Sequence, residues 1–227
     1  MDLTRQQQLF DPTKIICPIH VIGAGAVGSY MLETLARMGI TDIHAWDDDS
    51  VASHNIPNQL FSITNDVGKL KVDAITKTIR NFTGIQIKKH PIKVLSTTNI
   101  QGIAVVLVDS MKTRKQIWEG AIKYHPMVPL MIETRLGGES GTVYSVDPNN
   151  LLDVQAWEKS LFDDALASES LCGTTVVINP GVKTIVGYAA NALVQWSNNQ
   201  LIEKEIFWSH RPVMLTTKGA DWKELRY

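Results

Sequence analysis

The amino-acid sequence predicts an α/β protein: a mostly parallel sheet flanked by helices, with a small antiparallel extension at its C-terminal end. Two observations lead to this prediction. Short apolar runs alternate with helical patterns over the first two-thirds of the 227 residues, as they do in consecutive βαβ units. The first apolar run enters a glycine-rich turn at residues 23–28 (GAGAVG), and the second ends in an acidic triplet at residues 47–49. This order is typical of a Rossmann-like fold, which binds nucleotides at the carboxyl edge of its sheet.

The apolar runs predict parallel strands, and the segments between them predict helices. The helix after the glycine turn ends at Gly39, a residue type that favours a helix C-terminus. The second helix carries Leu70, Ala74, Ile75 and Ile79 at helical spacing. The predicted strands are residues 18–22, 42–46, 86–90, 103–108 and 129–133, and the predicted helices are residues 27–38, 69–81 and 113–124.

The last third of the chain shows a different pattern. Glycines at 137–141 predict a hairpin that leads into a strand over 142–146, and a short helix is expected over 154–161. Pro180 opens a long apolar helix over 181–196. We expect one domain over residues 1–227. Its predicted parts are an N-terminal arm (1–17), a Rossmann-like core (18–146), and a crossover loop, long helix and C-terminal strands (147–227), the last strands being 206–208 and 213–215.

Composition and charge exclude several function classes. The net charge is −1 and basic residues form no long block, so we expect neither a nucleic-acid partner nor a membrane surface. No apolar run reaches transmembrane length, and the first six residues are too polar for a signal peptide. Cys17 and Cys172 lie far apart, which favours a reducing compartment, and we expect a cytoplasmic protein. No zinc is expected, because the two cysteines and six histidines give no four-ligand spacing.

The glycine turn and the first acid of the triplet have the spacing of a nucleotide site. Gly23 permits a tight turn, Gly25 lets the backbone approach a phosphate, and Gly28 lets the helix pack closely on the strand. The start of that helix offers free N–H groups to phosphates. Asp47 lies 19 residues after Gly28, where a ribose-binding carboxylate is expected.

Further motifs follow in order: D-D-D-S-V at 47–51, S-H-N-I-P-N-Q at 53–59, G-K-L-K at 68–71, and Asp109 after the fourth predicted strand. This set resembles the ThiF/MoeB-type adenylyltransferases, relatives of the ubiquitin-activating enzymes. In that family, the glycine loop precedes D-x-D-x-V, S-x-N-x-x-R-Q and G-x-x-K segments and an aspartate after the fourth strand. The resemblance runs from Arg5-Gln6, similar to the family's N-terminal arginine segment, to the helix over 181–196.

The resemblance implies a role for each matching residue. Lys71 matches the family's catalytic lysine, and Asp109 matches its magnesium-binding aspartate. Arg5 matches an arginine that crosses into the partner subunit's site in relatives. The residues expected at the ATP site are Gly23, Gly25, Gly28, Asp47, Asp49, Asn55, Asn58, Gln59, Lys69 and Lys71.

The implied reaction is adenylation of a carboxylate, which attacks the α-phosphate of ATP while pyrophosphate leaves. Positioning and charge stabilisation then do most of the catalysis. Lys71 and Arg5 would place positive charge on the phosphates, and Asp109 would hold Mg²⁺. No general base is needed, because the attacking carboxylate is already ionised at neutral pH. Ordinary structural roles are the alternatives: Lys69 and Lys71 as solvated helix lysines, Asp109 as a helix cap, and Arg5 as a surface residue.

The chain departs from the family pattern at Asn58, where the family usually has arginine. An amide does not replace the charge of a guanidinium. Either Lys69 or Arg135 compensates for the missing charge, or activity is reduced or altered. The paired C-x-x-C motifs that bind zinc in many relatives are also absent.

Cys172 matches a cysteine that, in some relatives, bonds to the C-terminus of a carrier protein. A thiolate at this place would attack an acyl-adenylate. An inert cysteine is the alternative. Cys17, just before the first predicted strand, is expected to be structural.

The resemblance thus implies an ATP- and Mg²⁺-dependent adenylyltransferase that acts on the C-terminus of a ubiquitin-like carrier protein or peptide. A homodimer is expected, because Arg5 would serve a neighbouring subunit and the long apolar helix needs cover. Two alternatives remain at this stage. One is a nucleotide-binding scaffold of the same family whose catalysis is impaired by Asn58. The other is an NAD-dependent oxidoreductase, for which no hydride-transfer residue is evident.

Overall fold

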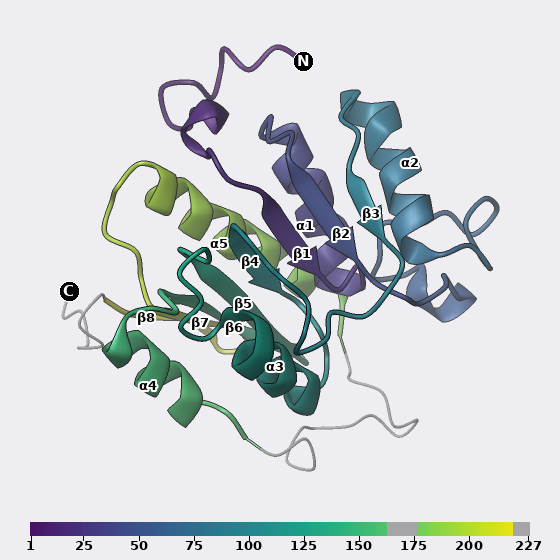
Figure 1. Ribbon diagram of the computed structural model, residues 1–227. Helices are drawn as coiled ribbons and strands as arrows, with labels where there is room; N and C mark the ends of the chain where they lie inside the picture. Colours follow the sequence, from purple (N-terminus) through teal and green to yellow (C-terminus); the bar gives the residue numbers. More distant parts are fainter. Residues whose placement is uncertain (163–176, 220–227) are drawn as a thin grey trace.

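A computed structural model describes residues 1–162 and 177–219, and eight strands form one continuous sheet in it (Figure 1). The strand order is β3-β2-β1-β4-β5-β6-β7-β8. The first five strands are parallel, and the last three pair antiparallel. This arrangement confirms the predicted fold class. The strands are β1 (Ile19–Ile22), β2 (Ile43–Trp46), β3 (Lys88–His90), β4 (Ile103–Val106), β5 (Met131–Gly137), β6 (Ser140–Val146), β7 (Glu205–His210) and β8 (Val213–Lys218).

Helices cover both faces of the sheet, and each face has its own apolar core. The helices α1 (Ala26–Arg37), α2 (Lys71–Thr83) and α5 (Asn179–Ser197) pack on one face. The other face is covered by α3 (Met111–Ile117), the π-helical turn η3 (Trp118–Ile122) and α4 (Leu151–Lys159). Two short 3-10 helices, η1 (Pro12–Lys14) and η2 (Ser53–Asn55), lie in the connections. Within the described ranges, no helix is long and apolar enough to cross a membrane.

Several element boundaries differ from the sequence-based prediction, and side-chain caps explain two of them. The helix predicted over 154–161 begins at Leu151, because the side chain of Asn150 accepts hydrogen bonds from the amides of Leu152 and Asp153. The helix predicted over 113–124 begins at Met111 behind the cap Ser110, and it ends at Ile117 before the π-helical turn. Capping side chains shift helix starts that apolar periodicity alone does not locate.

The other differences concern extended segments. The predicted helix over 69–81 begins at Lys71, because Leu70 stays extended and forms an isolated bridge with Ser50. β5 continues four residues beyond its predicted end at Glu133 and runs directly into β6 through a tight turn. Gly138 has φ +59° in this turn, a conformation that favours glycine.

Three histidines lie side by side across the parallel strands at one end of the sheet. The ring centroids of His20 and His44 are 4.5 Å apart, those of His44 and His90 are 5.1 Å apart, and Trp46 stacks on His90 at 3.8 Å. Trp46 Nε1 donates to His20 Nδ1 at 3.2 Å, so this nitrogen carries no proton. His20 Nε2 lies 3.0 Å from the carbonyl oxygen of Gln101 and donates to it. Burial lowers the pKa of His20 to about 4, and burial also lowers the pKa values of His44 and His90.

These lowered pKa values predict a loss of stability in acid. An unfolded histidine takes up a proton near pH 6.5, whereas folded His20 stays neutral until about pH 4. The free energy of unfolding therefore has its full value above pH 6.5. It falls by about 3 kcal/mol on account of His20 as the pH drops from 6.5 towards 4. Urea unfolding at a series of pH values measures this. The variant His20→Gln should show a shallower dependence of the unfolding free energy on pH, and an unchanged dependence would contradict the role of His20.

Candidate functional site

The glycine-rich turn lies between β1 and the start of α1, at the carboxyl edge of the sheet (Figure 1). Gly23 has φ +99°, and a Cβ atom added to it would lie 3.0 Å from the carbonyl oxygen of Leu107. A Cβ atom on Gly28 would lie 1.8 Å from the carbonyl oxygen of Gly23, so the turn requires glycine at both places. At Gly25, an added Cβ would meet no heavy atom within 4 Å. Open space therefore lies beside the N-terminus of α1, where backbone N–H groups favour a phosphate.

Asp47 follows β2 and fixes the glycine turn. Its Oδ2 accepts a hydrogen bond from the amide of Ala24 at 2.7 Å, and its Oδ1 accepts one from the amide of Asp49 at 2.8 Å. Burial raises the pKa of the Asp47 carboxyl, although the Lys71 ammonium and both amides act in the opposite direction. An ionised carboxylate has about four acceptor positions, so two bonds to the backbone leave capacity for a ribose hydroxyl.

Lys71 reaches back from the first residue of α2 to the acidic triplet. Its Nζ lies 2.7 Å from Asp49 Oδ2 and 3.9 Å from Asp47 Oδ1. The main chain follows the same path, because the amide of Lys71 donates to the carbonyl oxygen of Asp49 at 2.9 Å. The Lys71 side chain is only 9% exposed, whereas that of Asp49 is 63% exposed. A cation is thus held in a fixed place between two carboxylates, beside the glycine turn.

Three more of the predicted site residues lie in η2 or just after it, between β2 and α2. Asn55 Oδ1 accepts a hydrogen bond from the amide of Ala52 at 2.8 Å and thereby closes the turn of η2. Asn58 Nδ2 donates to the carbonyl oxygen of Val177 at 2.8 Å. The side chain of Asn58 therefore holds the chain just ahead of α5. Gln59 Oε1 is buried and accepts no hydrogen bond within the described part of the chain.

Asp109 lies at the same edge, three residues after β4 ends at Val106. Its side chain is exposed, and Ser110 caps the following helix in its place. β4 pairs directly with β1, so Asp109 and the glycine turn come from neighbouring strands. Carboxylate oxygens are the ligands that Mg²⁺ prefers, and Mg²⁺ commonly takes one or two of them together with substrate phosphates and water. An exposed carboxylate that follows the strand next to the glycine turn fits that requirement. The carboxylates of Asp47, Asp48 and Asp49 also lie within 4.8 Å of one another.

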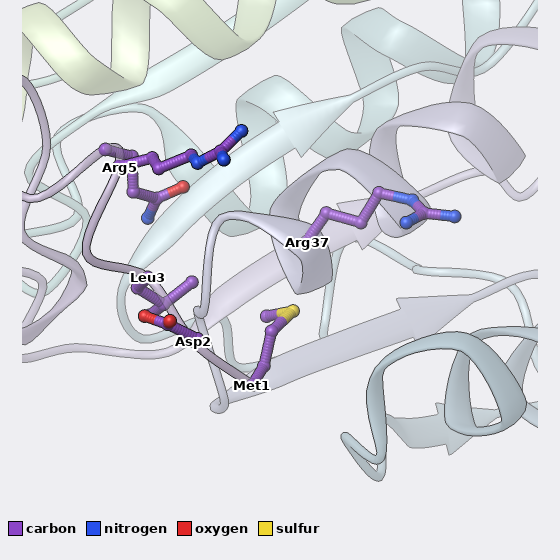
Figure 2. Close-up of a pocket in the computed structure, with 6 residues that line it drawn as sticks. Met1, Asp2, Leu3, Arg5 and Arg37 are labelled. Carbon is purple, nitrogen blue, oxygen red and sulfur yellow. The ribbon is translucent and has the colours of Figure 1, made fainter.

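Arg5 lies away from this cluster within its own chain. It lines a shallow pocket with Met1, Asp2, Leu3, Gln6 and Arg37 (Figure 2). Arg37 is the last residue of α1, whereas the glycine turn precedes its first residue, about 18 Å away along a 12-residue helix. Gln6 Nε2 donates to the carbonyl oxygen of Met38 at 2.7 Å and ties the arm to this end of the helix. Arg5 therefore does not join the glycine turn of its own chain.

The two candidates for the charge missing at position 58 differ in their surroundings. Arg135 is engaged: its Nε contacts Glu133 Oε2 at 3.0 Å, and its Nη1 donates to the carbonyl oxygen of Ser160 at 2.7 Å. Lys69 is exposed in the turn just before α2. Lys69 is thus the better placed of the two for an anionic ligand.

The two cysteines were singled out from the sequence, whereas one buried ion pair was not. Burial raises the pKa of the Cys17 thiol, which fits the expected structural role. Cys172 lies outside the described residues. Periodicity gave no indication that Glu133 is completely buried and paired with Arg114. The available signal was a glutamate at the end of an otherwise apolar strand, because such a charge needs a buried partner.

Known proteins share sequence and fold with this chain. The chain matches the model of the ThiF family over residues 15–226. Ubiquitin-like modifier-activating enzyme 5 of Xenopus laevis is 27% identical over 164 residues, which cover 72% of this chain and 37% of that enzyme. The tRNA threonylcarbamoyladenosine dehydratase of Haemophilus influenzae is 39% identical over 62 residues, or 27% of this chain and 24% of that protein. The chain therefore spans well under half of the length of these relatives.

Solved structures share the fold at low sequence identity. The crystal structure of PaaA has a TM-score of 0.70 and 16% identity, covering 96% of this chain and 68% of PaaA. The structure of E. coli MccB with MccA-N7isoASN has a TM-score of 0.73 and 14% identity, covering 92% of this chain and 66% of MccB. These likenesses establish the fold alone. The family model spans nearly the whole chain, and the protein therefore belongs to the ThiF family.

Proposed function

We propose that this protein adenylates a carboxylate with ATP and Mg²⁺, releasing pyrophosphate. The observation that carries the proposal is Lys71, a buried cation held by Asp49 and Asp47 directly beside the glycine turn. The name of one relative and the nucleotide in one similar structure also support this activity. One curated relative is a ubiquitin-like modifier-activating enzyme, and E. coli MccB has been crystallised with ATP. The family favours this function over the NAD-dependent alternative.

The chain's own residues would bind and orient the nucleotide. The N-terminus of α1 and the backbone at Gly25 bind phosphates, and Asp47 accepts hydrogen bonds from the ribose hydroxyls. The same nucleotide site is lined by Asn55, Gln59 and Lys69. Asn58 supports the site indirectly, because its side chain holds the main chain at Val177. Lys69 supplies part of the charge that an arginine at position 58 would bring.

An oxygen of the substrate carboxylate attacks the α-phosphorus, and the bond to the bridging oxygen of the β-phosphate breaks. The products are an acyl-adenylate and pyrophosphate. Lys71 stabilises the charge that develops on the phosphate oxygens, and its fixed place avoids reorganisation during the reaction. Asp109 would hold Mg²⁺, which would supply positive charge to the leaving pyrophosphate when bound with ATP.

The substrate is the C-terminal carboxylate of a ubiquitin-like carrier protein or a peptide. Solved structures of MccB with MccA support this substrate class. The dehydratase relatives point to a tRNA nucleoside as the other candidate. A net charge of −1 disfavours tRNA, because non-specific binding to nucleic acid depends on basic surface. We propose that the protein acts in the cytoplasm as a homodimer, in which Arg5 serves the partner's nucleotide site.

Loss of the buried cation should abolish most of the activity. Lys71→Ala should reduce ATP–pyrophosphate exchange by on the order of 100-fold, because it removes a charge aimed at the transition state. Lys69→Ala, the matched control two residues earlier, should reduce exchange less. Exchange is measured with peptides that end in free carboxylates, and thermal unfolding checks that the variants are folded. A larger loss in Lys69→Ala would contradict the assignment of Lys71, and ATP binding without any exchange in the unmodified protein would favour the catalytically impaired scaffold.

The proposed role of Arg5 can be tested by mixing two inactive variants. Arg5→Ala lacks the arginine and Lys71→Ala lacks the lysine, but a mixed dimer contains one site with both residues intact. Random pairing of equal amounts gives half mixed dimers, so exchange should recover to about a quarter of the unmodified level. Light scattering measures the assembly state. An active monomer, or no recovery in a confirmed mixed dimer, would rule out the exchange of Arg5 between subunits.

Cys172 should separate adenylation from any later covalent step. The variant Cys172→Ser should exchange pyrophosphate normally, because attack of a carboxylate on ATP uses no thiol. A covalent adduct with the carrier, detected by mass spectrometry and sensitive to added thiol, should disappear in this variant. If the unmodified protein forms no such adduct with a carrier that it adenylates, Cys172 has no role as a nucleophile.

A further inference from the structure

A buried ion pair contacts the main chain one residue before Asp109. The side chain of Glu133 on β5 is 0% exposed, and its carboxylate pairs with the guanidinium of Arg114 on α3. Arg114 also donates to two main-chain carbonyl oxygens. Its Nη1 bonds to that of Thr134 at 2.6 Å, and its Nη2 bonds to that of Val108. Val108 is the residue that immediately precedes Asp109.

The bond to Val108 lies where the sheet no longer holds the chain. β4 ends at Val106, and the amide of Leu107 makes the next bond, to the carbonyl oxygen of Ile22 at 2.9 Å. Beyond Leu107 the chain leaves the sheet and turns into α3, which starts at Met111. Arg114 thus links the end of β4 to β5 across the base of this turn. The link is made to the residue next to Asp109.

Glu133 determines the direction of the Arg114 guanidinium. Its carboxylate also accepts a hydrogen bond from Trp157 Nε1 at 3.2 Å and contacts Arg135 Nε at 3.0 Å. A buried ion pair contributes little to stability compared with apolar residues of the same size, because both charges lose their hydration. Its planar, fixed geometry instead gives positional accuracy. Arg135 is the outer member of the cluster, since its side chain is 12% exposed, against 6% for that of Arg114. Its guanidinium lies over the ring of Tyr144 at 4.4 Å.

We propose that Glu133 and Arg114 are positioning residues for Asp109. Glu133 orients Arg114, Arg114 holds the carbonyl group of Val108, and the Asp109 carboxylate is thereby kept at the edge of the nucleotide site. This inference rests on the proposed function of Asp109 towards Mg²⁺ and ATP. Residues that orient a metal ligand commonly change metal affinity by 10- to 100-fold when they are substituted.

The first test measures the effect of Mg²⁺ on ATP binding by calorimetry, with excess Mg²⁺ and with EDTA. Mg²⁺ should tighten ATP binding in the unmodified protein, and Asp109→Asn should abolish this gain. Glu133→Gln, which keeps the size of the side chain, should reduce the gain by about tenfold. ATP binding in EDTA should stay within about twofold, because the glycine turn and Asp47 are untouched. In the Asp109→Asn background, Glu133→Gln should have no further effect on the gain.

A matched control separates positioning from general destabilisation. Asp153, in the first turn of α4, is also a buried carboxylate, and it pairs with Lys204 Nζ at 2.5 Å. Asp153 follows β6, which runs antiparallel to β5. The ion pair of Asp153 and Lys204 therefore lies at the edge of the sheet opposite to Asp109 and the glycine turn. Asp153→Asn should lower the melting temperature but leave the effect of Mg²⁺ unchanged.

The second test needs no nucleotide. Hydrogen exchange of the amides at 108–112 should become faster in Glu133→Gln and in Arg114→Lys, because the compact ammonium of a lysine lacks the planar fork with which the guanidinium spans both carbonyl groups and the Glu133 carboxylate. The same amides should be unaffected in Asp153→Asn. Unchanged exchange, or equal acceleration in Asp153→Asn, would overturn the proposal. Absence of any Mg²⁺ effect in the unmodified protein would instead overturn the proposed role of Asp109, and the exchange data would still decide whether the ion pair holds the end of β4.

Discussion

The hydrogen bond from the amide of Ala24 to the Asp47 carboxylate is the contact on which the rest of the site depends. It joins the turn after β1 to the end of β2, and the same carboxylate receives the amide of Asp49. Asp49 in turn receives both the main-chain amide and the ammonium of Lys71. One buried acid therefore relates the glycine turn, the acidic triplet and the start of α2 to one another, and a change at Asp47 would move all three.

Two charge clusters at the carboxyl edge of the sheet differ in their exposure to solvent. In the first, Lys71 is buried but its nearer partner Asp49 is 63% exposed, so a phosphate could approach the ammonium from the solvent side. In the second, Glu133 is 0% exposed and Arg114 also bonds to two carbonyl oxygens, so the pair has no open side. The first arrangement is suited to an exchange of partners with a ligand. The second is suited to holding the main chain, since leaving either charge unpaired would be costly.

Local patterns in the sequence were sufficient for the order of the elements, because apolar periodicity and the glycine turn depend on neighbouring residues. The spacing between the glycine turn and the acidic triplet also led to Asp47. Lys71 was found only through the resemblance to the family, because it begins α2 and reaches back to the residues after β2. Local patterns were not sufficient where a side chain finds its partner far along the chain. Asn58 bonds to Val177, 119 residues away, and Glu133 is paired by Arg114 from another layer of the fold. Neither contact has a periodic signal.

The uncharged side chain of Asn58 leaves the site with fewer positive charges than an arginine at this position would give. Four carboxylates, those of Asp47, Asp48, Asp49 and Asp109, follow strands at the carboxyl edge of the sheet. Three lysines stand against them: Lys69, Lys71, and Lys93, whose Nζ lies 3.7 Å from Asp48 Oδ2. An arginine at position 58 would offset one more of these charges, whereas the amide there ties the chain to the start of α5. Free ATP carries several negative charges and would meet a site with an excess of carboxylates. The electrostatics therefore favour ATP in its complex with a divalent cation, so that the cation offsets the charge that position 58 does not.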